Sequence, residues 1–438
     1  MELLTRTIAA LSAALAAMSA GGAGAANTVQ PADDPQRLVD EGRYLAVAGD
    51  CIACHTRVNG EPFSGGRPLH TPFGVLYSAN ITPERNTGIG AWSEAQVELA
   101  MRAGIAADGT HLYPAFPYTA YTKLTDRDMH ALYAYLRSLK PVTYTPPKNA
   151  MRFPFSVRAL LTGWNLLFFE EGRYAPNSSR SAEWNRGAYL TQGLGHCGAC
   201  HSPRNFFGGE RSADAFTGGD YLDEIPDEVV NDKITPMDES TVRPWAAANL
   251  TSARSGLGAW SVDTIAAYLK TGHSERAAAF GPMSEVIGRS TSHLTDQDVH
   301  AIAVYLKSLP PATQGAPGKP AADALKAGEI VYTTHCADCH LPTGLGMPRV
   351  ANADASKTAP PLAGNAALQA PNPATLINVI LYGAHEAVLT DGSWPKMSGF
   401  ELSVGLDDEQ IAALCTYVRN SWGNQAGGVD AATVAKQH

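Results

Sequence analysis

The sequence predicts an all-α protein made of three tandem units, and three observations support this fold class. The pentapeptide pattern C-x-x-C-H occurs three times. Each copy follows a short segment with one apolar helical face, and each unit closes with a second segment of helical period. The 438 residues also leave room for about three domains of ordinary size.

The N-terminal residues 1–25 have the composition of a secretory signal peptide. Arg6 precedes an apolar run from Ile8 to Ala17, and small residues follow with alanine at positions 23 and 25. The run could instead be a retained anchor, but it is shorter than the ~20 apolar residues of a spanning helix. We therefore expect an exported mature protein that is soluble or peripherally attached to a membrane.

The rest of the chain divides into three units, two linkers and a tail. The expected units are 36–140, 181–309 and 323–424, the linkers are 141–180 and 310–322, and the tail is 425–438.

The C-x-x-C-H pattern is the attachment site of a c-type haem. The two thiols add across the porphyrin vinyl groups, and the adjacent histidine reaches the iron as its proximal ligand. A redox dithiol would explain one copy, but not three copies that are each followed by histidine. The haem-attaching residues are Cys51, Cys54, His55, Cys197, Cys200, His201, Cys336, Cys339 and His340. We therefore expect three class I-like cytochrome c domains, each wrapped around one covalently bound haem and its iron.

The closing segments of the three units predict equivalent helices that pack on the haems. In the first, Thr125 is a natural N-cap, and Met129 begins an i, i+3, i+4, i+7 apolar stripe. The seventh cysteine, Cys415, falls on the same stripe of the third helix, so we expect a small buried apolar side chain there. Met101 also has the register of a core residue.

The sixth iron ligand should be a methionine from the loop before the closing helix, because its soft thioether binds iron opposite histidine. Met283 and Met397 stand there in the second and third units. At the matching distance from the helix-ending glycine, the first unit has Phe116. The first iron is then five-coordinate or bound by another group, such as His111, Tyr113 or a displaced methionine. Either arrangement implies a lower reduction potential.

The two linkers differ in composition. Residues 310–322 are rich in Pro, Gly and Ala and predict an extended connection. Residues 151–172 are rich in Phe, Trp and Leu, yet too short to span a membrane. We expect this stretch to pack between the first and second units, because aromatic side chains are mostly buried. The alternative is an exposed patch that meets a partner subunit or the bilayer surface.

The net charge of −9 and the pI near 5.8 argue against a nucleic-acid partner. Walker loops, dinucleotide fingerprints and Ser-His-Asp sets do not occur in a convincing context, so no catalytic residue is assigned.

Several stretches resemble the triple-haem cytochrome c subunit of membrane-bound periplasmic dehydrogenases that oxidise alcohols, gluconate, sorbitol or fructose. They include "GRYLAVAGDCIACH", "RGAYLTQGLGHCGACHSPRN" and "HLYPAFPYTAYTKLTD", and the resemblance runs from about Gln36 to Asn424. It implies the same haem ligands, with Phe116 where several members have methionine. The C-terminal residues lack the hydrophobic tail of some members.

The resemblance also implies a role in electron transfer. The subunit takes electrons from a catalytic dehydrogenase subunit with a quinone or flavin cofactor, in a complex that can include a small third subunit. It passes them to ubiquinone or a terminal oxidase at the periplasmic face of the inner membrane. Two alternatives remain: a free-standing periplasmic electron carrier, and a peroxidase-like haem enzyme acting at an open first haem.

Overall fold

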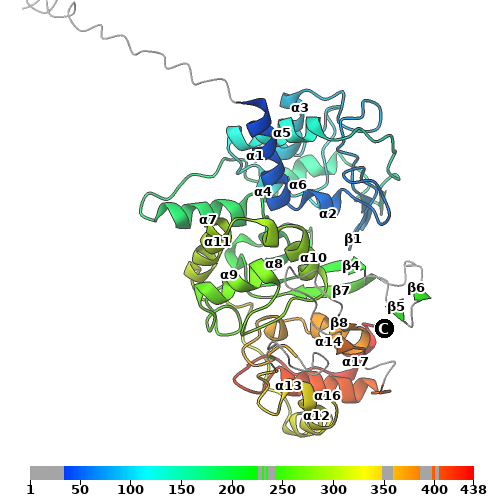
Figure 1. Ribbon diagram of the computed structural model, residues 1–438. Coiled ribbons are helices and arrows are strands. Elements are labelled where there is room, and N and C mark those ends of the chain that lie inside the picture. The colour runs from blue at the N-terminus through cyan, green and yellow to red at the C-terminus, as the bar shows by residue number, and fades with distance from the viewer. Residues whose placement is uncertain are drawn as a thin grey trace, which may run out of the picture. The chain divides into compact units, whose positions relative to one another are not determined.

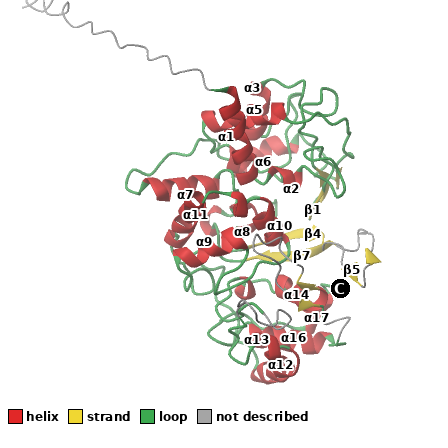
Figure 2. Cartoon of the chain, viewed as in Figure 1, coloured by secondary structure: helices red, strands yellow, loops and turns green. Residues whose placement is uncertain are grey.

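The computed structural model describes residues 34–224, 229–230, 233–234, 242–347, 359–384, 397–399 and 404–438. The expected signal peptide lies outside these residues. The described chain is mostly helical with a few short strands (Figures 1 and 2). None of its helices has both the length and the apolar character needed to cross a membrane.

The helices follow one another in the order that the sequence predicts. The N-terminal part contains α1 (Pro35–Ala48), α2 (Cys51–Cys54), α3 (Glu94–Ala103), α4 (Tyr118–Tyr121), α5 (Asp126–Ser138) and α6 (Leu160–Phe168). The middle part contains α7 (Ala182–Gln192), α8 (Gly198–His201), α9 (Val262–Thr271), α10 (Pro282–Arg289) and α11 (Asp296–Ser308). The C-terminal part contains α12 (Ala322–His335), α13 (Ala337–His340), α14 (Ala374–Tyr382), α16 (Asp408–Val418) and α17 (Ala431–Ala435).

Short antiparallel strands make the all-α expectation too strict. The pairs are β1 (Pro68–Thr71) with β2 (Gly74–Tyr77), β2 with β3 (Ala150–Met151), β4 (Gly219–Glu224) with β7 (Val242–Ala247), β5 (Val229–Val230) with β6 (Lys233–Ile234), and β8 (Gly383–Ala384) with β9 (Met397–Ser398). These strands have two to six residues each, too few for a clear period-two pattern. The turn between β1 and β2 depends on Gly74, whose φ of 132° favours glycine.

Three pairs of helices cross in the same close manner: α1 with α5, α7 with α11, and α12 with α16. In each pair a glycine faces an alanine carbonyl: Gly42 with Ala131, Gly187 with Ala301, and Gly328 with Ala413. A Cβ atom on these glycines would lie 1.9, 1.9 and 2.0 Å from the carbonyl oxygens. Only glycine therefore allows the backbones to approach this closely.

The closing helices α5, α11 and α16 begin as the sequence predicts. The side chains of Thr125, Thr295 and Asp407 each accept a hydrogen bond from the backbone N–H three residues later. Met129 is buried in the first helix, and Cys415 is fully buried in the apolar core of the third. The prediction that Cys415 is a buried apolar side chain is confirmed.

The aromatic linker is not mainly buried, so the favoured expectation for it is wrong in part. Leu161 of α6 is buried, but Leu166 and Leu167 are 86% and 72% exposed. One face of α6 contacts the loop 111–118, and Trp164 donates from Nε1 to the carbonyl of Phe207 in the second unit. A single nine-residue helix can bury only one face, and its other apolar side chains remain in solvent.

The C-terminal residues fold back on the third unit. Helix α17 packs on α16, and Val434 is fully buried in the same core. The hydroxyl of Tyr382 donates to the carbonyl of Gln437. The tail is therefore an integral part of this unit.

Candidate haem sites

The histidine of each C-x-x-C-H motif is held by a backbone carbonyl. Nδ1 lies 2.7, 2.7 and 2.9 Å from the acceptor in the pairs His55–Ala79, His201–Ala248 and His340–Pro360. A carbonyl oxygen only accepts, so Nδ1 carries the proton and Nε2 keeps its lone pair. Proximal histidine ligands are commonly oriented in this way by a partner of the second ring nitrogen.

The electrostatic environment favours neutral imidazoles. Burial lowers the pKa of His55, His201 and His340, and the hydrogen bonds to the carbonyls oppose this only in part. The three rings are therefore uncharged at neutral pH, which is the form that binds a metal.

The six motif cysteines form no disulfide among themselves. Burial raises the pKa of Cys51, Cys197 and Cys336 to about 12 in each case. A redox-active dithiol needs a lowered thiol pKa, so this environment does not fit that chemistry. Two free thiols on one helical turn and an oriented histidine beside them do fit a covalently attached haem. All three motifs have this donor set.

The loop that should carry the sixth ligand has the same start in the first two units. Short antiparallel bridges join Ile105 to His111 and His273 to Ala278. Phe116 stands five residues after the first bridge, and Met283 five residues after the second. Phe116 and Met283 therefore stand at the same distance after the bridge that opens their loops.

In the third unit, Met397 lies in β9 and pairs with Ala384, directly after the glycine that ends α14. Residues 385–396 of this loop lie outside the described chain. The pairing of β8 with β9 therefore brings Met397 close to the C-terminal end of α14.

The other candidate ligands of the first unit are engaged elsewhere. Nε2 of His111 lies 3.1 Å from the hydroxyl of Thr162, and Nδ1 faces the side-chain amide of Asn165 at 3.5 Å. The hydroxyl of Tyr113 donates to the carbonyl of Phe155 at 3.0 Å. Met101 and Met129 are both buried in the helical core. His111 and Tyr113 are thus held by other groups, and Met101 and Met129 are buried on their helices, as their register predicts.

The first two haem motifs share a wall that sequence reasoning did not predict. The ring of Tyr121 contacts both Phe116 and His196, at 5.5 and 5.7 Å between centroids. Its hydroxyl points to the carbonyl of Gly49 at 3.5 Å. Gly49 and His196 stand just before the two cysteine motifs, so Tyr121 lies between them.

A salt bridge also joins the first motif to the methionine helix of the second unit. Arg67 donates to the carbonyl of Ala53 at 2.7 Å and binds Glu285 of α10 through both terminal nitrogens, at 2.7 and 2.9 Å. Glu285 stands two residues after Met283. Arg67 and Glu285 are 218 residues apart, and no local pattern in the sequence pairs them.

Comparison with known proteins agrees with this geometry. The cytochrome c family model matches residues 39–140 and 325–422, which contain the first and third motifs. The cytochrome c subunit of alcohol dehydrogenase (quinone) from Gluconacetobacter polyoxogenes is 39% identical, over 93% of this chain and 85% of its own length. The fructose dehydrogenase cytochrome subunit of Gluconobacter japonicus is 36% identical, over 92% and 83%.

A longer protein, one of the subunits of nicotinate dehydrogenase from Pseudomonas putida, is 42% identical over 87% of this chain, which spans only 30% of that protein. The helical fold and the donor sets define a c-type cytochrome, which binds haem c covalently. More specifically, the chain belongs to the family of cytochrome c subunits of dehydrogenases.

Proposed function

We propose that the chain carries three haem c groups and relays electrons from a catalytic dehydrogenase subunit to membrane ubiquinone or a terminal oxidase. The haems would occupy three tandem cytochrome c domains at 36–140, 181–309 and 323–424. The observation that carries the proposal is the repeated donor set, in which every motif histidine is oriented by a carbonyl.

The residues of this chain have distinct roles at each site. Haem c supplies a one-electron couple when it is bound. The cysteine pairs would hold it, and the carbonyls of Ala79, Ala248 and Pro360 orient the histidines that would bind its iron. Met283 and Met397 would supply thioether ligands at the second and third sites.

The first site differs because Phe116 replaces the methionine. We infer that its iron has no methionine ligand and a lower potential than the other two. A peroxidase-like reaction there would need a placed proton donor. His111 is directed to Thr162 and Asn165 of α6, which favours electron transfer over this alternative.

The expected signal peptide and the relatives support a proposed location and proposed partners. The mature protein would be exported and lie at the periplasmic face of the inner membrane. Its catalytic partner would be a quinoprotein or flavoprotein that oxidises an alcohol, a sugar or a sugar acid, with a small third subunit as a further component. A free-standing carrier without a dedicated dehydrogenase is the competing assignment.

Mass spectrometry of the mature protein, combined with affinity purification from its native membrane, tests the proposal. We expect the mass of the chain plus three haems, and a co-purified subunit with a flavin or quinone cofactor. A different number of covalent haems would contradict the three-domain assignment. Recovery of the cytochrome without any cofactor-bearing subunit would favour the free-standing carrier.

A further inference from the structure

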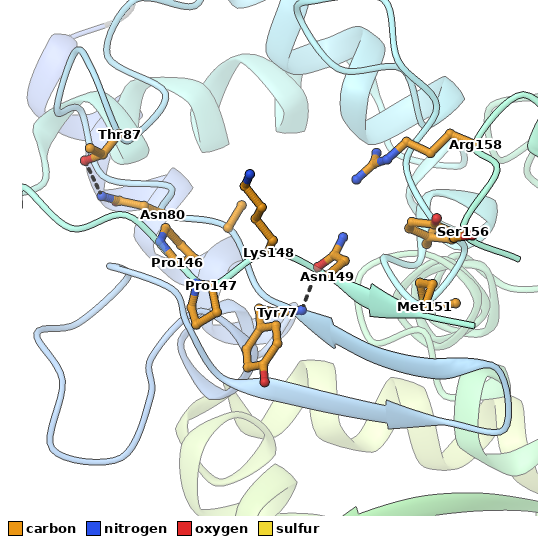
Figure 3. A pocket seen from close by; sticks show the side chains of 12 residues that line it. Tyr77, Asn80, Thr87, Pro146, Pro147, Lys148, Asn149, Met151, Ser156 and Arg158 are labelled. Carbon is orange, nitrogen blue, oxygen red and sulfur yellow. Dashed lines mark hydrogen bonds between the residues drawn. The ribbon is translucent and has the colours of Figure 1, made fainter. Parts of the chain in front are cut away.

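The first unit contains a cavity of about 450 Å³ that the proposed electron relay does not by itself explain (Figure 3). Its lining comes from several parts of the first unit and from the linker 141–180. Residues 77–80 end and follow β2, Thr87 and Tyr113 lie further along the first unit, and residues 146–151, Ser156 and Arg158 belong to the linker. The linker therefore contributes to the first unit.

The cavity adjoins both sides of the first haem site. The carbonyl of Ala79, one of the lining residues, accepts the hydrogen bond from His55 on the proximal side. Tyr113 belongs to the loop that should carry the sixth ligand, which we call the distal loop, and stands three residues before Phe116. A cavity that touches the proximal and the distal wall of a haem site lies at an edge of the porphyrin.

The cysteines identify which edge this is. Cys51 and Cys54 fix the vinyl groups, and neither is part of the cavity lining. The charged groups at the periphery of a haem are its two propionate carboxylates, which lie away from the uncharged vinyl groups that the cysteines attach. The cavity therefore adjoins the part of the site where carboxylates are expected.

The charged side chains of the lining are both cationic, namely Lys148 and Arg158. In Figure 3 they extend toward the same space from two different segments. Arg158 is half-buried and is positioned by a 2.8 Å hydrogen bond from Nη1 to the carbonyl of His111 and by the ring of Tyr113, 5.0 Å away. Besides the hydrogen bonds that the Asp108 carboxyl accepts, the charge of Arg158 helps to hold the pKa of this carboxyl below its usual range. The planar fork of Arg158 is well suited to a carboxylate.

The second unit shows which part of this arrangement is specific to the first. Asn80 and Asn249 are equivalent, and each donates from Nδ2 to a carbonyl after the closing helix, that of Val142 or Ala312. After that point the first unit continues into the cationic segment 148–158, whereas the second continues into the Pro, Gly and Ala linker. The linker 141–180 is thus the source of both cations.

We propose that Arg158 and Lys148 bind the propionate carboxylates of the first haem, and that the linker segment 148–158 is part of that haem site. This inference rests on the proposed attachment of a haem at Cys51 and Cys54. It gives the linker a second role besides connecting two units, because its positive charges raise the potential of the haem that lacks a methionine. Positive charge near a haem disfavours the ferric state.

Redox titration of the full-length haem-loaded protein tests the inference. The variants are Arg158→Gln, Lys148→Gln and the charge-conserving Arg158→Lys. Arg152→Gln is the matched control, because Arg152 is exposed on the same segment but outside the cavity lining. The variants are also made in a Phe116→Met background. The reduction step whose potential differs between this background and the wild type is assigned to the first haem and is called the marked wave.

We expect Arg158→Gln and Lys148→Gln to lower the potential of the marked wave, which belongs to the first haem. The potentials of the other two haems should stay unchanged. Arg158→Lys should retain most of the wild-type potential, and Arg152→Gln should leave all three waves unchanged. If the two cavity variants behave like Arg152→Gln, the inference is wrong.

Two further measurements separate the possible failures. Haem content is determined for every variant. Three haems per chain without the predicted shift in reduction potential would overturn this inference alone. A wild-type protein without a haem at the first motif would overturn the proposed function. Acetate is then added to the wild type. If the marked wave shifts with acetate concentration and Arg158→Gln abolishes that dependence, the cavity binds free carboxylates and the propionate assignment is wrong.

Discussion

The loop before the closing helix is held differently in the first and second units, although it begins in the same way in both. In the second unit this loop provides Met283, and α10 is tied to the first unit by Glu285 and Arg67. In the first unit Phe116 cannot bind iron, and the neighbouring segment is held instead by the aromatic linker. The contacts are Arg158 to the carbonyl of His111, Thr162 to His111, Tyr113 to Phe155 and Tyr118 to Asn165. A distal loop can therefore be fixed without an iron–methionine bond when another segment supplies the contacts.

The largest expected effect concerns the close helix crossing that both units share. Gly42→Ala or Gly187→Ala would place a Cβ atom 1.9 Å from a backbone carbonyl oxygen. We expect each to lower the free energy of unfolding by about 3 kcal/mol or more, since backbone cannot move aside as a side chain can. Denaturant unfolding followed by circular dichroism measures this.

Gly163→Ala in α6 is the matched control, because a Cβ there meets no atom within 4 Å. It should raise helix stability by up to about 1 kcal/mol. Equal effects of Gly187→Ala and Gly163→Ala would show that the close helix crossing is not required.

Met283→Phe should convert the second site into a copy of the first. The iron loses its thioether ligand, and the potential of one haem should fall by at least about 60 mV, a tenfold change in a one-electron equilibrium. Redox titration with optical detection measures the shift. If the potential is unchanged, Met283 is not the sixth ligand.

Phe116→Met is the reverse substitution, and it should raise the potential of one haem. We expect a smaller change than for Met283→Phe, because the linker holds the loop in a position adapted to phenylalanine. The accompanying change from a high-spin to a low-spin ferric signal is measured by EPR. A variant that keeps a high-spin signal would mean that residue 116 does not reach the iron.

Loosening the contact between α6 and the loop should affect the first unit alone. Asn165→Ala removes the partner of the Tyr118 hydroxyl, at 2.6 Å, and should cost about 1 kcal/mol of unfolding free energy. Leu166→Ala, on the exposed face of the same helix, should stay within about 0.5 kcal/mol of the wild type. A similar loss in both variants would indicate a general effect on α6.

A further contrast between the units concerns pH and the residue before each motif. Burial, with the nearby charge of Glu285, raises the pKa of Asp50 to about 8, whereas the second and third motifs are preceded by histidine. Because the folded-state pKa of Asp50 is above the unfolded value of about 4, the contribution of this carboxyl to stability is fully present below pH 4 and is lost as pH rises toward 8. Asp50→Asn should remove this part of the pH dependence. An unchanged pH profile of unfolding would contradict the assignment.

Local patterns in the sequence predicted the parts of the fold that depend on neighbouring residues. The cap at Thr125 and the burial of Cys415 follow from spacing and period, and the structure agrees with them. The equivalence of Phe116 and Met283 was also predicted by counting from a glycine. These features involve residues within one helix or one loop.

Features that join distant segments could not be predicted in this way. The Arg67–Glu285 pair spans 218 residues, and Tyr121 meets His196 across two units. The aromatic linker was expected to be buried, because composition does not reveal that a short helix covers only the loop 111–118 with one face. The short strands were missed because runs of two to six residues carry little periodic signal.

The central claim is that the first iron lacks a methionine ligand whereas the other two have one, and an EPR spectrum of the oxidised protein tests it most directly. A redox titration of the same sample assigns a potential to each signal. We expect one high-spin haem of low potential and two low-spin haems of higher potential. Three low-spin signals would show that the first iron has a sixth protein ligand and would contradict it.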